Sequence, residues 1–243
     1  MLKLIRYLVN IYNIRLKHKS NTIICTGKNE GKANYFVKGL KVRIKGKNNQ
    51  IVIKDFNNKI IDFGDLKIKI SGSNNRIILS QNLYFSKSEI FVYAQDSFME
   101  IDESKFQILH TNFIFAEKDS HNTFLKIGKN FSSNGCGFAI GGSNIGITIG
   151  QDCMFSYNTE IRNYDGHKIL NKQNEVINTP TTTMNIGDHV WMGADSKILK
   201  DVSVASNTII GVGSIVTKTV DESNVAIAGI PAKIVKKEVN WER

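Results

Sequence analysis

The clearest pattern along the chain is a repeat of six residues in its C-terminal third. Between residues 186 and 221, six consecutive hexads each begin with an aliphatic residue and carry a small or β-branched residue at the fifth position. This period matches neither the 3.6 residues of an α-helix turn nor the alternation of a half-buried strand. The hexads begin at Ile186, Met192, Ile198, Val204, Ile210 and Val216.

A period of six predicts short parallel strands joined by tight turns, with three strands closing one triangular coil. The aliphatic column then stacks inside the coils, and small residues fit the corners where the backbone turns. Such coils are not stable alone, because each coil pairs its strands with the coil below it. The sequence therefore predicts an all-β fold, a parallel β-helix.

Weaker forms of the repeat extend upstream. Segments 44–53 and 70–79 resemble each other, and each places an Asn pair between two apolar runs. Asn pairs in this setting are typical of turns. We interpret residues 21–126 as irregular early coils, so that the β-helix spans residues 21–225. A separate small β domain over 21–126 is the alternative.

Three segments fall outside the repeat. The hexad register is lost over residues 168–185 and resumes at Ile186, which predicts a long loop, and loops of this length are more often functional than decorative. Residues 226–243 leave the repeat and are expected to form a C-terminal cap. Residues 1–20 mix apolar and basic side chains, which predicts a short basic amphipathic helix that covers one end of the fold or lies on a membrane face.

The positive charge of the chain is concentrated near its N-terminus. The 243 residues carry a formal net charge of +10, and residues 1–60 alone hold 14 basic and 2 acidic residues, a net of +12. Such a field attracts a polyanion such as an acidic glycan or an anionic membrane, although a basic face also keeps a protein in solution. We do not expect nucleic acid, because the sequence has no aromatic-studded basic pattern and no helix-turn-helix.

The three cysteines indicate a reducing environment. Cys25, Cys136 and Cys153 have no metal-ligand spacing, and their odd number excludes a disulfide scaffold. We therefore expect a cytoplasmic protein, with peripheral contact to an anionic membrane through residues 1–60 as an option. No apolar run reaches the length of a membrane-spanning helix. No set of His, Glu and Asp has zinc spacing, so no metal is expected.

Two residues are candidates for chemistry. Trp191 takes the last place of its hexad, so its side chain should point outward, where a Trp lines a pocket or a subunit interface. His167 stands at the base of the 168–185 loop, where a neutral imidazole can take a proton from a hydroxyl group, and Asp165 could orient the ring. The plainer alternatives are a lone surface aromatic and an ordinary polar turn residue.

The hexads and three longer segments resemble a known family. IGDHVWMGADSKIL, IIGVGSIVTK and AGIPAKIV are similar to segments of the hexapeptide-repeat acetyltransferases, over about residues 127–236. The resemblance implies a left-handed coil. Within the family it is strongest to the galactoside and maltose O-acetyltransferases and to the capsular polysaccharide or sialic acid O-acetyltransferases.

The resemblance also implies roles for matching residues. The general-base His of the family matches His167, and its active-site Trp matches Trp191, with the spacing between the two that the family shows. An Asn near the reacting carbonyl matches Asn134. The positions that receive acetyl-CoA match Ala194 and Val212 for the pantetheine arm, and Thr217, Lys218, Lys233 and Lys236 for the phosphates.

Family members transfer the acyl group directly and form trimers, with the coenzyme groove between neighbouring copies. We therefore expect a homotrimeric, acetyl-CoA-dependent O-acetyltransferase that acts on a sugar hydroxyl of a surface or capsular polysaccharide or its precursor. The basic N-terminal quarter favours an anionic acceptor such as a sialic acid glycan. Two alternatives stay open: a small-molecule galactoside or amino-sugar acetyltransferase, and a non-enzymatic β-helix that binds polyanions.

Overall fold

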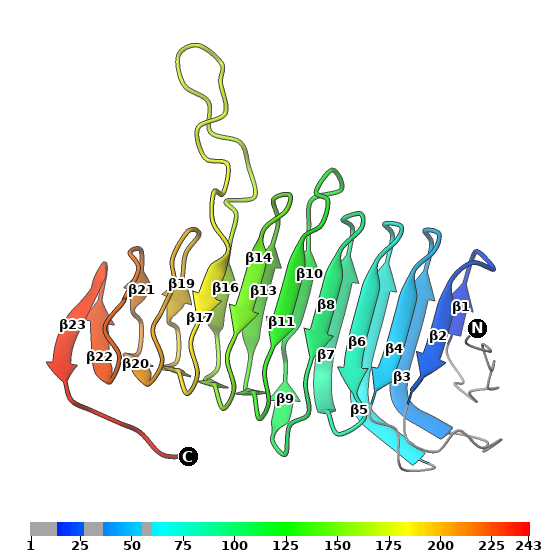
Figure 1. The fold of residues 1–243 in the computed structure, drawn as a ribbon, viewed down its shortest axis with the longest axis horizontal. Helices are drawn as coiled ribbons and strands as arrows, with labels where there is room; N and C mark the ends of the chain where they lie inside the picture. Colours follow the sequence, from blue (N-terminus) through cyan, green and yellow to red (C-terminus); the bar gives the residue numbers. More distant parts are fainter. Residues whose placement is uncertain (1–13, 27–35, 55–59) are drawn as a thin grey trace.

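The computed structural model describes residues 14–26, 36–54 and 60–243 and consists of stacked strands and turns (Figure 1). These residues form one elongated parallel β-helix, which confirms the architecture predicted from the hexads. They include no α-helix, and hence none long and apolar enough to cross a bilayer.

The coils have three faces, which we number face 1, face 2 and face 3. Face 1 stacks β1 (Ile14–Leu16), β3 (Phe36–Ile44), β5 (Ile60–Ile70), β7 (Tyr84–Val92), β10 (Asn112–Phe115), β13 (Cys136–Ile140), β16 (Thr159–Arg162), β19 (Lys197–Ile198) and β21 (Ile215–Val216). Face 2 stacks β2 (Thr22–Cys25), β4 (Gln50–Lys54), β6 (Arg76–Ser80), β8 (Phe98–Ile101), β11 (Phe124–Ile127), β14 (Gly146–Ile149) and β17 (Met184–Ile186).

Face 3 stacks β9 (Gln107–Leu109), β12 (Ser132–Ser133), β15 (Met154–Phe155), β18 (Trp191–Met192), β20 (Thr208–Ile210) and β22 (Val225–Gly229). The long strand β7 joins faces 3 and 1, because its first part pairs with β9 and its second part with β10. The chain therefore visits face 2, face 3 and face 1 in turn and then starts the next coil.

Coil length explains why only the last third of the sequence shows a clean repeat. Ile198 pairs with Val216, so one coil there is three hexads long. Earlier coils are longer than three hexads, as the pairing of Ile68 with Ile90 and of Phe113 with Phe138 shows. Those early coils continue the same stack, because β7 and β8 pair directly with β10 and β11.

The interior is a column of apolar side chains. All six hexad starters are buried, with exposed fractions of 2% or less. In the wider coils upstream, aromatic rings take over, and the Phe113 and Phe138 rings stack with centroids 5.0 Å apart. The hexads thus predicted correctly which side chains point inward.

The two Asn pairs form turns, and their second members form a buried ladder. Asn48 and Asn74 have φ values of 54° and 60°, the left-handed conformation that Asn tolerates. Asn49 and Asn75 are buried, and the Asn49 Oδ1 accepts from both the backbone N and the Nδ2 of Asn75 at 3.0 Å. Asn21 extends the ladder to the previous coil.

The predicted ends of the chain differ in how far the structure describes them. The helix predicted over 1–20 falls mainly on residues 1–13, which lie outside the described residues. Its last part is not helical, because Ile14–Leu16 form β1 and pair with β3. At the other end, β23 (Ala232–Lys237) pairs antiparallel with β22. The last residues then run back along the coils, where Trp241 is buried.

Candidate active site

His167 lies at the corner between faces 1 and 2, at the base of the 168–185 loop. It comes shortly after the end of β16, and its side chain is exposed. The loop leaves the stack as a long projecting hairpin (Figure 1). The backbone N of Ile177 donates to the carbonyl of Ile169 at 2.9 Å, which closes the hairpin. The long loop predicted from the lost register is therefore present next to His167.

Asp165, Asn178 and Lys200 clamp the base of this loop. The Asp165 carboxylate accepts hydrogen bonds from Lys200 Nζ and, at 2.8 Å, from Asn178 Nδ2. Lys200 Nζ also donates to the Asn178 carbonyl at 3.0 Å, and Asn178 Nδ2 donates to the His167 carbonyl at 2.8 Å. Burial raises the pKa of Asp165, but the bonds from Lys200 and Asn178 outweigh it and hold the pKa below its usual value.

The role predicted for Asp165 therefore takes a different form. Its carboxylate binds Lys200 and Asn178 rather than the His167 ring. It affects His167 through the backbone, because Asn178 joins the carboxylate to the His167 carbonyl. Asp165 therefore holds the backbone at His167 rather than its ring.

Trp191 points outward from face 3, as its place in the hexad predicts. Its neighbour Met192 is fully buried, whereas Trp191 is half-buried. The indole N–H points to Ser156 Oγ at 3.4 Å, and the ring lies 6.1 Å from that of Trp241, which stacks on His189 at 4.1 Å. Trp191 thus stands in a wall of aromatic rings that residues near the end of the chain complete.

The structure does not bring His167 and Trp191 together within one chain. His167 precedes face 2 at the corner shared with face 1, whereas Trp191 follows face 2 on β18 of face 3. Asn134 also borders face 3, because it directly follows β12. The constellation predicted as one site is therefore divided between the corner of faces 1 and 2, which holds His167, and face 3, which holds Trp191 and is bordered by Asn134.

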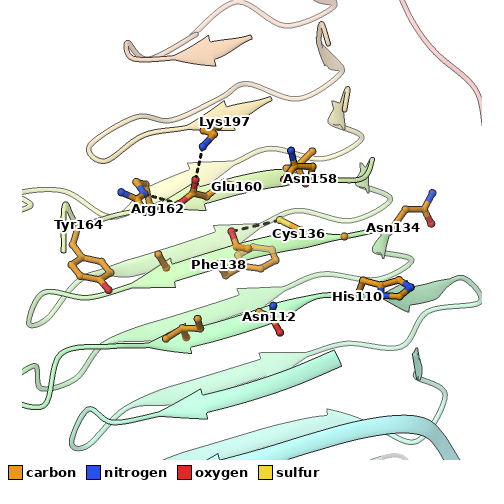
Figure 2. Close-up of a pocket in the computed structure, with 15 residues that line it drawn as sticks. His110, Asn112, Asn134, Cys136, Phe138, Asn158, Glu160, Arg162, Tyr164 and Lys197 are labelled. Atoms are coloured by element: carbon orange, nitrogen blue, oxygen red, sulfur yellow. Dashed lines mark hydrogen bonds and ion pairs between the residues drawn. The ribbon is translucent and has the colours of Figure 1, made fainter. Parts of the chain in front are cut away.

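A groove of about 630 Å³ runs across face 1 (Figure 2). Its floor is β13, where the outward positions carry the small residues Gly137 and Ala139. Asn134 and His110 lie at one end of the groove, and Tyr164, close before His167 in the chain, lies at the other. The groove thus leads from the face 3 border towards the loop base.

The groove carries a positively charged wall. Arg162 Nε donates to Glu160 Oε1 at 2.7 Å, and Lys197 Nζ lies 3.1 Å from Glu160 Oε2 (Figure 2). Although burial raises the pKa of Glu160, the contacts with Lys197 and Arg162 hold it below its usual value. Two cations on one carboxylate leave a net positive charge beside the amides of Asn112 and Asn158.

Sequence reasoning missed this wall, although part of the signal was present. Glu160 and Arg162 flank the buried Ile161, so alternation along the strand makes both outward-facing. Lys197 meets them only because β16 pairs with β19 across the 168–185 loop. Because the loop lies between the two strands, the sequence does not show that Lys197 lies next to Glu160 in the stack.

The residues predicted to bind acetyl-CoA lie at three places. Ala194 and Val212 share the corner between faces 3 and 1, where the Gly213 backbone N donates to the Ala194 carbonyl at 2.8 Å, and Val212 is 73% exposed. Thr217 and Lys218 follow β21 at the corner between faces 1 and 2. Lys233 and Lys236 are exposed on β23. One chain does not gather these three places.

The cysteines are poor nucleophiles. Burial raises the pKa of Cys136 and of Cys153 to about 12, and that of Cys25 to about 11. The reactive form of a cysteine is the thiolate, so these thiols stay protonated and inert at neutral pH. The described residues also contain no group of three His, Cys, Asp or Glu side chains arranged to hold a metal ion.

Sequence comparison relates the chain to O-acetyltransferases. It is 32% identical over 123 residues to the galactoside O-acetyltransferase of Escherichia coli K12, which covers 50% of this chain and 57% of the relative. It is 44% identical over 98 residues to the polysialic acid O-acetyltransferase of Neisseria meningitidis, and this match covers 40% of this chain and 45% of the relative. The chain spans about half the length of the curated relatives it matches. No family model matches.

Structure comparison gives polysialic acid acetyltransferases that match over nearly the whole chain. The polysialic acid O-acetyltransferase OatWY superposes with a TM-score of 0.60 and 25% identity, and covers 92% of this chain and 89% of its own. The polysialic acid-specific acetyltransferase NeuO superposes with a TM-score of 0.54 and 27% identity, and covers 92% and 85%. These relatives confirm the resemblance to hexapeptide-repeat acetyltransferases that the sequence motifs carry.

Proposed function

We propose that this chain, a relative of the hexapeptide-repeat O-acetyltransferases, transfers an acetyl group from acetyl-CoA to a hydroxyl of an acidic surface polysaccharide or its precursor. The observation that carries the proposal is a groove with a cationic wall that extends to Tyr164, shortly before the exposed imidazole of His167 in the chain. The relatives named above act on polysialic acid or galactosides according to their names. A carboxylate-bearing sugar fits the Arg162 and Lys197 side better than a neutral one does.

The chemistry is one direct transfer. His167 takes the proton of the acceptor hydroxyl as that oxygen attacks the thioester carbonyl carbon. The carbon–sulfur bond then breaks, and the thiolate of the coenzyme receives the proton from the imidazolium. The buried, high-pKa thiols Cys136 and Cys153 support a route without an acyl-enzyme.

The separation of His167 from Trp191 and Asn134 within one chain supports a homotrimer. His167 of one copy would face Trp191 and Asn134 of its neighbour, because those two border the same face 3. Asn134 would then hold the oxyanion, and Trp191 would position the thioester. The same neighbour would present Val212 to the pantetheine arm, and the exposed Lys218, Lys233 and Lys236 would meet the phosphates.

The test measures the free thiol released when the purified protein is incubated with acetyl-CoA and polysialic acid. Replacing His167→Ala should lower kcat by roughly 10²–10⁴, because that is the usual contribution of a general base. His121→Ala is the matched control, since His121 is another exposed imidazole, paired with Asp96 at 3.2 Å on an earlier coil. A protein that is trimeric yet releases no thiol with any sugar acceptor would refute the proposal.

A small galactoside is the second candidate acceptor, and the galactoside O-acetyltransferase relative favours it. The two candidates differ in what the cations of the groove do. With an acidic glycan, Arg162→Gln should raise KM for the acceptor; with a neutral galactoside, the same change should leave KM nearly unaltered. Comparing the two acceptors on both proteins decides between them.

A further inference from the structure

The early coils stack cations on one another along face 1. In the β1–β3–β5 register, Arg15 pairs with Arg43, and Arg43 pairs with Lys69. In the next outward column, Lys41 pairs with Lys67. We call these five residues the basic ladder. Neighbouring strands lie about 4.8 Å apart, so like charges follow one another at that spacing.

This arrangement works against the stability of the chain alone. Like charges directly opposite each other on paired strands are destabilising. Two acids partly offset the ladder: Asp65 lies 3.5 Å from Lys41, and Glu89 lies 2.9 Å from Lys67 and 3.9 Å from Lys69. Arg15 and Arg43 are exposed and form no ion pair with other residues in the described part of the chain. The ladder therefore keeps a net charge of about +3 that an external anion can neutralise.

The ladder is continuous with the groove. Lys69 pairs in register with Phe91 of β7, and Phe91 with Ile114 of β10, which lines the groove. Ile114 is thus four strands from Arg15, or about 19 Å. All these side chains belong to outward positions of face 1, so one linear ligand can lie along the ladder and reach the groove. Phe91, with Lys69 Nζ 4.6 Å from its ring centroid, bridges the two parts.

We infer that the basic ladder binds a stretch of the acidic polysaccharide acceptor outside the groove and feeds neighbouring sugars of the same chain to His167. The inference rests on the proposed function for the identity of the acceptor. A polymer that carries one carboxylate on each sugar matches a straight row of cations better than a membrane does, because the ladder leads along the coils into the groove. The surface would thus distinguish long acceptors from short ones.

Binding without acetyl-CoA tests the ladder independently of catalysis. Calorimetry would compare long polysialic acid with a trimer of sialic acid at about 50 and about 200 mM salt. The triple variant Arg15→Gln, Arg43→Gln and Lys69→Gln should bind the long polymer about tenfold more weakly at low salt, with a shallower salt dependence, since three exposed charge contacts are lost. The affinity of this variant for the sialic acid trimer should equal that of the wild-type protein.

The control variant removes the same charge elsewhere. Arg76→Gln, Lys105→Gln and Lys126→Gln lie off face 1, on β6, after β8 and on β11. This control should lose less than about twofold in affinity. Equal losses in both triple variants, or no loss in the ladder variant, would overturn the inference. So would tighter binding of the wild-type protein to duplex DNA or to anionic vesicles than to polysialic acid.

Kinetics separates the two proposals. If acetyl transfer occurs, the ladder variant should raise KM about tenfold for the long polymer only, with kcat unchanged. If the ladder variant transfers acetyl groups and its KM changes equally for long and short acceptors, the inference about the basic ladder is wrong and the proposed function is unaffected. If the wild-type protein transfers acetyl to no glycan, the proposed function fails, and the binding experiment still decides whether the ladder holds the polymer.

Discussion

The clamp at the loop base offers the sharpest test of how the fold positions His167. Lys200→Met removes the cation that binds both the Asp165 carboxylate and the Asn178 carbonyl, and keeps a side chain of similar length. Asn178 still bonds Asp165 and the His167 carbonyl, so the loop base is weakened rather than dismantled. The variant therefore probes positioning of the imidazole without touching it.

The size of the effect follows from these contacts. Hydrogen bonds to charged groups contribute roughly 1.5–3 kcal/mol each when well buried. The side chains of Lys200 and Asp165 are 24% and 33% exposed, and this exposure reduces each bond to about 1 kcal/mol, so the two bonds together contribute about 2 kcal/mol. That amount shifts the balance between the anchored and the released loop base about thirtyfold. We expect kcat to fall between about fivefold and thirtyfold, with KM for acetyl-CoA unchanged.

Steady-state kinetics measures the fall in kcat, and limited proteolysis of the 168–185 loop measures how often the loop base is released. Lys172→Met, in the loop itself and exposed, should behave as wild type. Lys197→Met, close to Lys200 in the chain but in the groove, should instead raise KM for an acidic acceptor. If Lys200→Met is cleaved no faster in the loop and keeps the wild-type kcat, the clamp does not position His167.

Three further predictions concern stability. Asn49→Ala should lower the free energy of unfolding by about 2–5 kcal/mol in urea titrations, because it leaves the Gly72 carbonyl and the Asn75 backbone N without their partner. Asn48→Gly, at a φ of 54°, should change it by less than about 0.5 kcal/mol, and equal effects would contradict the buried Asn ladder. Among the described residues, six carboxylates have lowered pKa values in the folded state, so the stability they contribute is present above about pH 4 and should fall as the pH drops below it; they are Asp96, Glu103, Asp152, Glu160, Asp165 and Asp201. A urea midpoint that stays constant from about pH 5 to about pH 3 would exclude this linkage. Gly146→Ala should be strongly destabilising in thermal unfolding, because the added Cβ would lie 2.1 Å from the Phe124 carbonyl oxygen. Gly137→Ala, whose added Cβ would meet the Glu160 side chain at 3.9 Å, should fold at least as stably as wild type, and the reverse order would show that the coil spacing is wrong.

The hexads predicted the core well because a period of six is a direct record of which side chains point inward. Met192 and Ile198 are buried at the expected places, and Trp191 faces outward between the corners. Counting hexad positions in the sequence would also have predicted that His167 and Trp191 lie apart. With the 168–185 loop removed, His167 directly precedes the hexad of Ile186, and Trp191 ends that hexad, so one strand of face 2 must separate them.

Other contacts could not be predicted, because no local pattern encodes them. Arg243 donates to the Cys153 carbonyl at 2.9 Å and lies 4.0 Å from the centroid of the Phe106 ring, both distant partners along the chain, and Arg243 itself stands in a segment without any repeat. The Glu160 and Lys197 pair spans the loop. Such contacts depend on which coils are neighbours, and coil length varies along the chain, most of all where the loop follows β16.

A triangular coil limits how any catalytic site can be built from its side chains. Strands alternate inward and outward residues, so each coil offers chemistry only on its outer faces and corners, and those of one chain diverge from one another. His167 at one corner and Trp191 beyond face 2 are held by a rigid stack, since Met184 and Ile186 between them are buried in the core. Closing that separation within one chain would require the coil itself to collapse. Packing one corner of a chain against face 3 of a second copy closes it at no such cost. Under the proposed mechanism a second copy therefore has to supply Trp191, which gives a prediction: a variant that stays folded as a monomer should keep the groove and its affinity for the acidic acceptor, and lose acetyl transfer entirely.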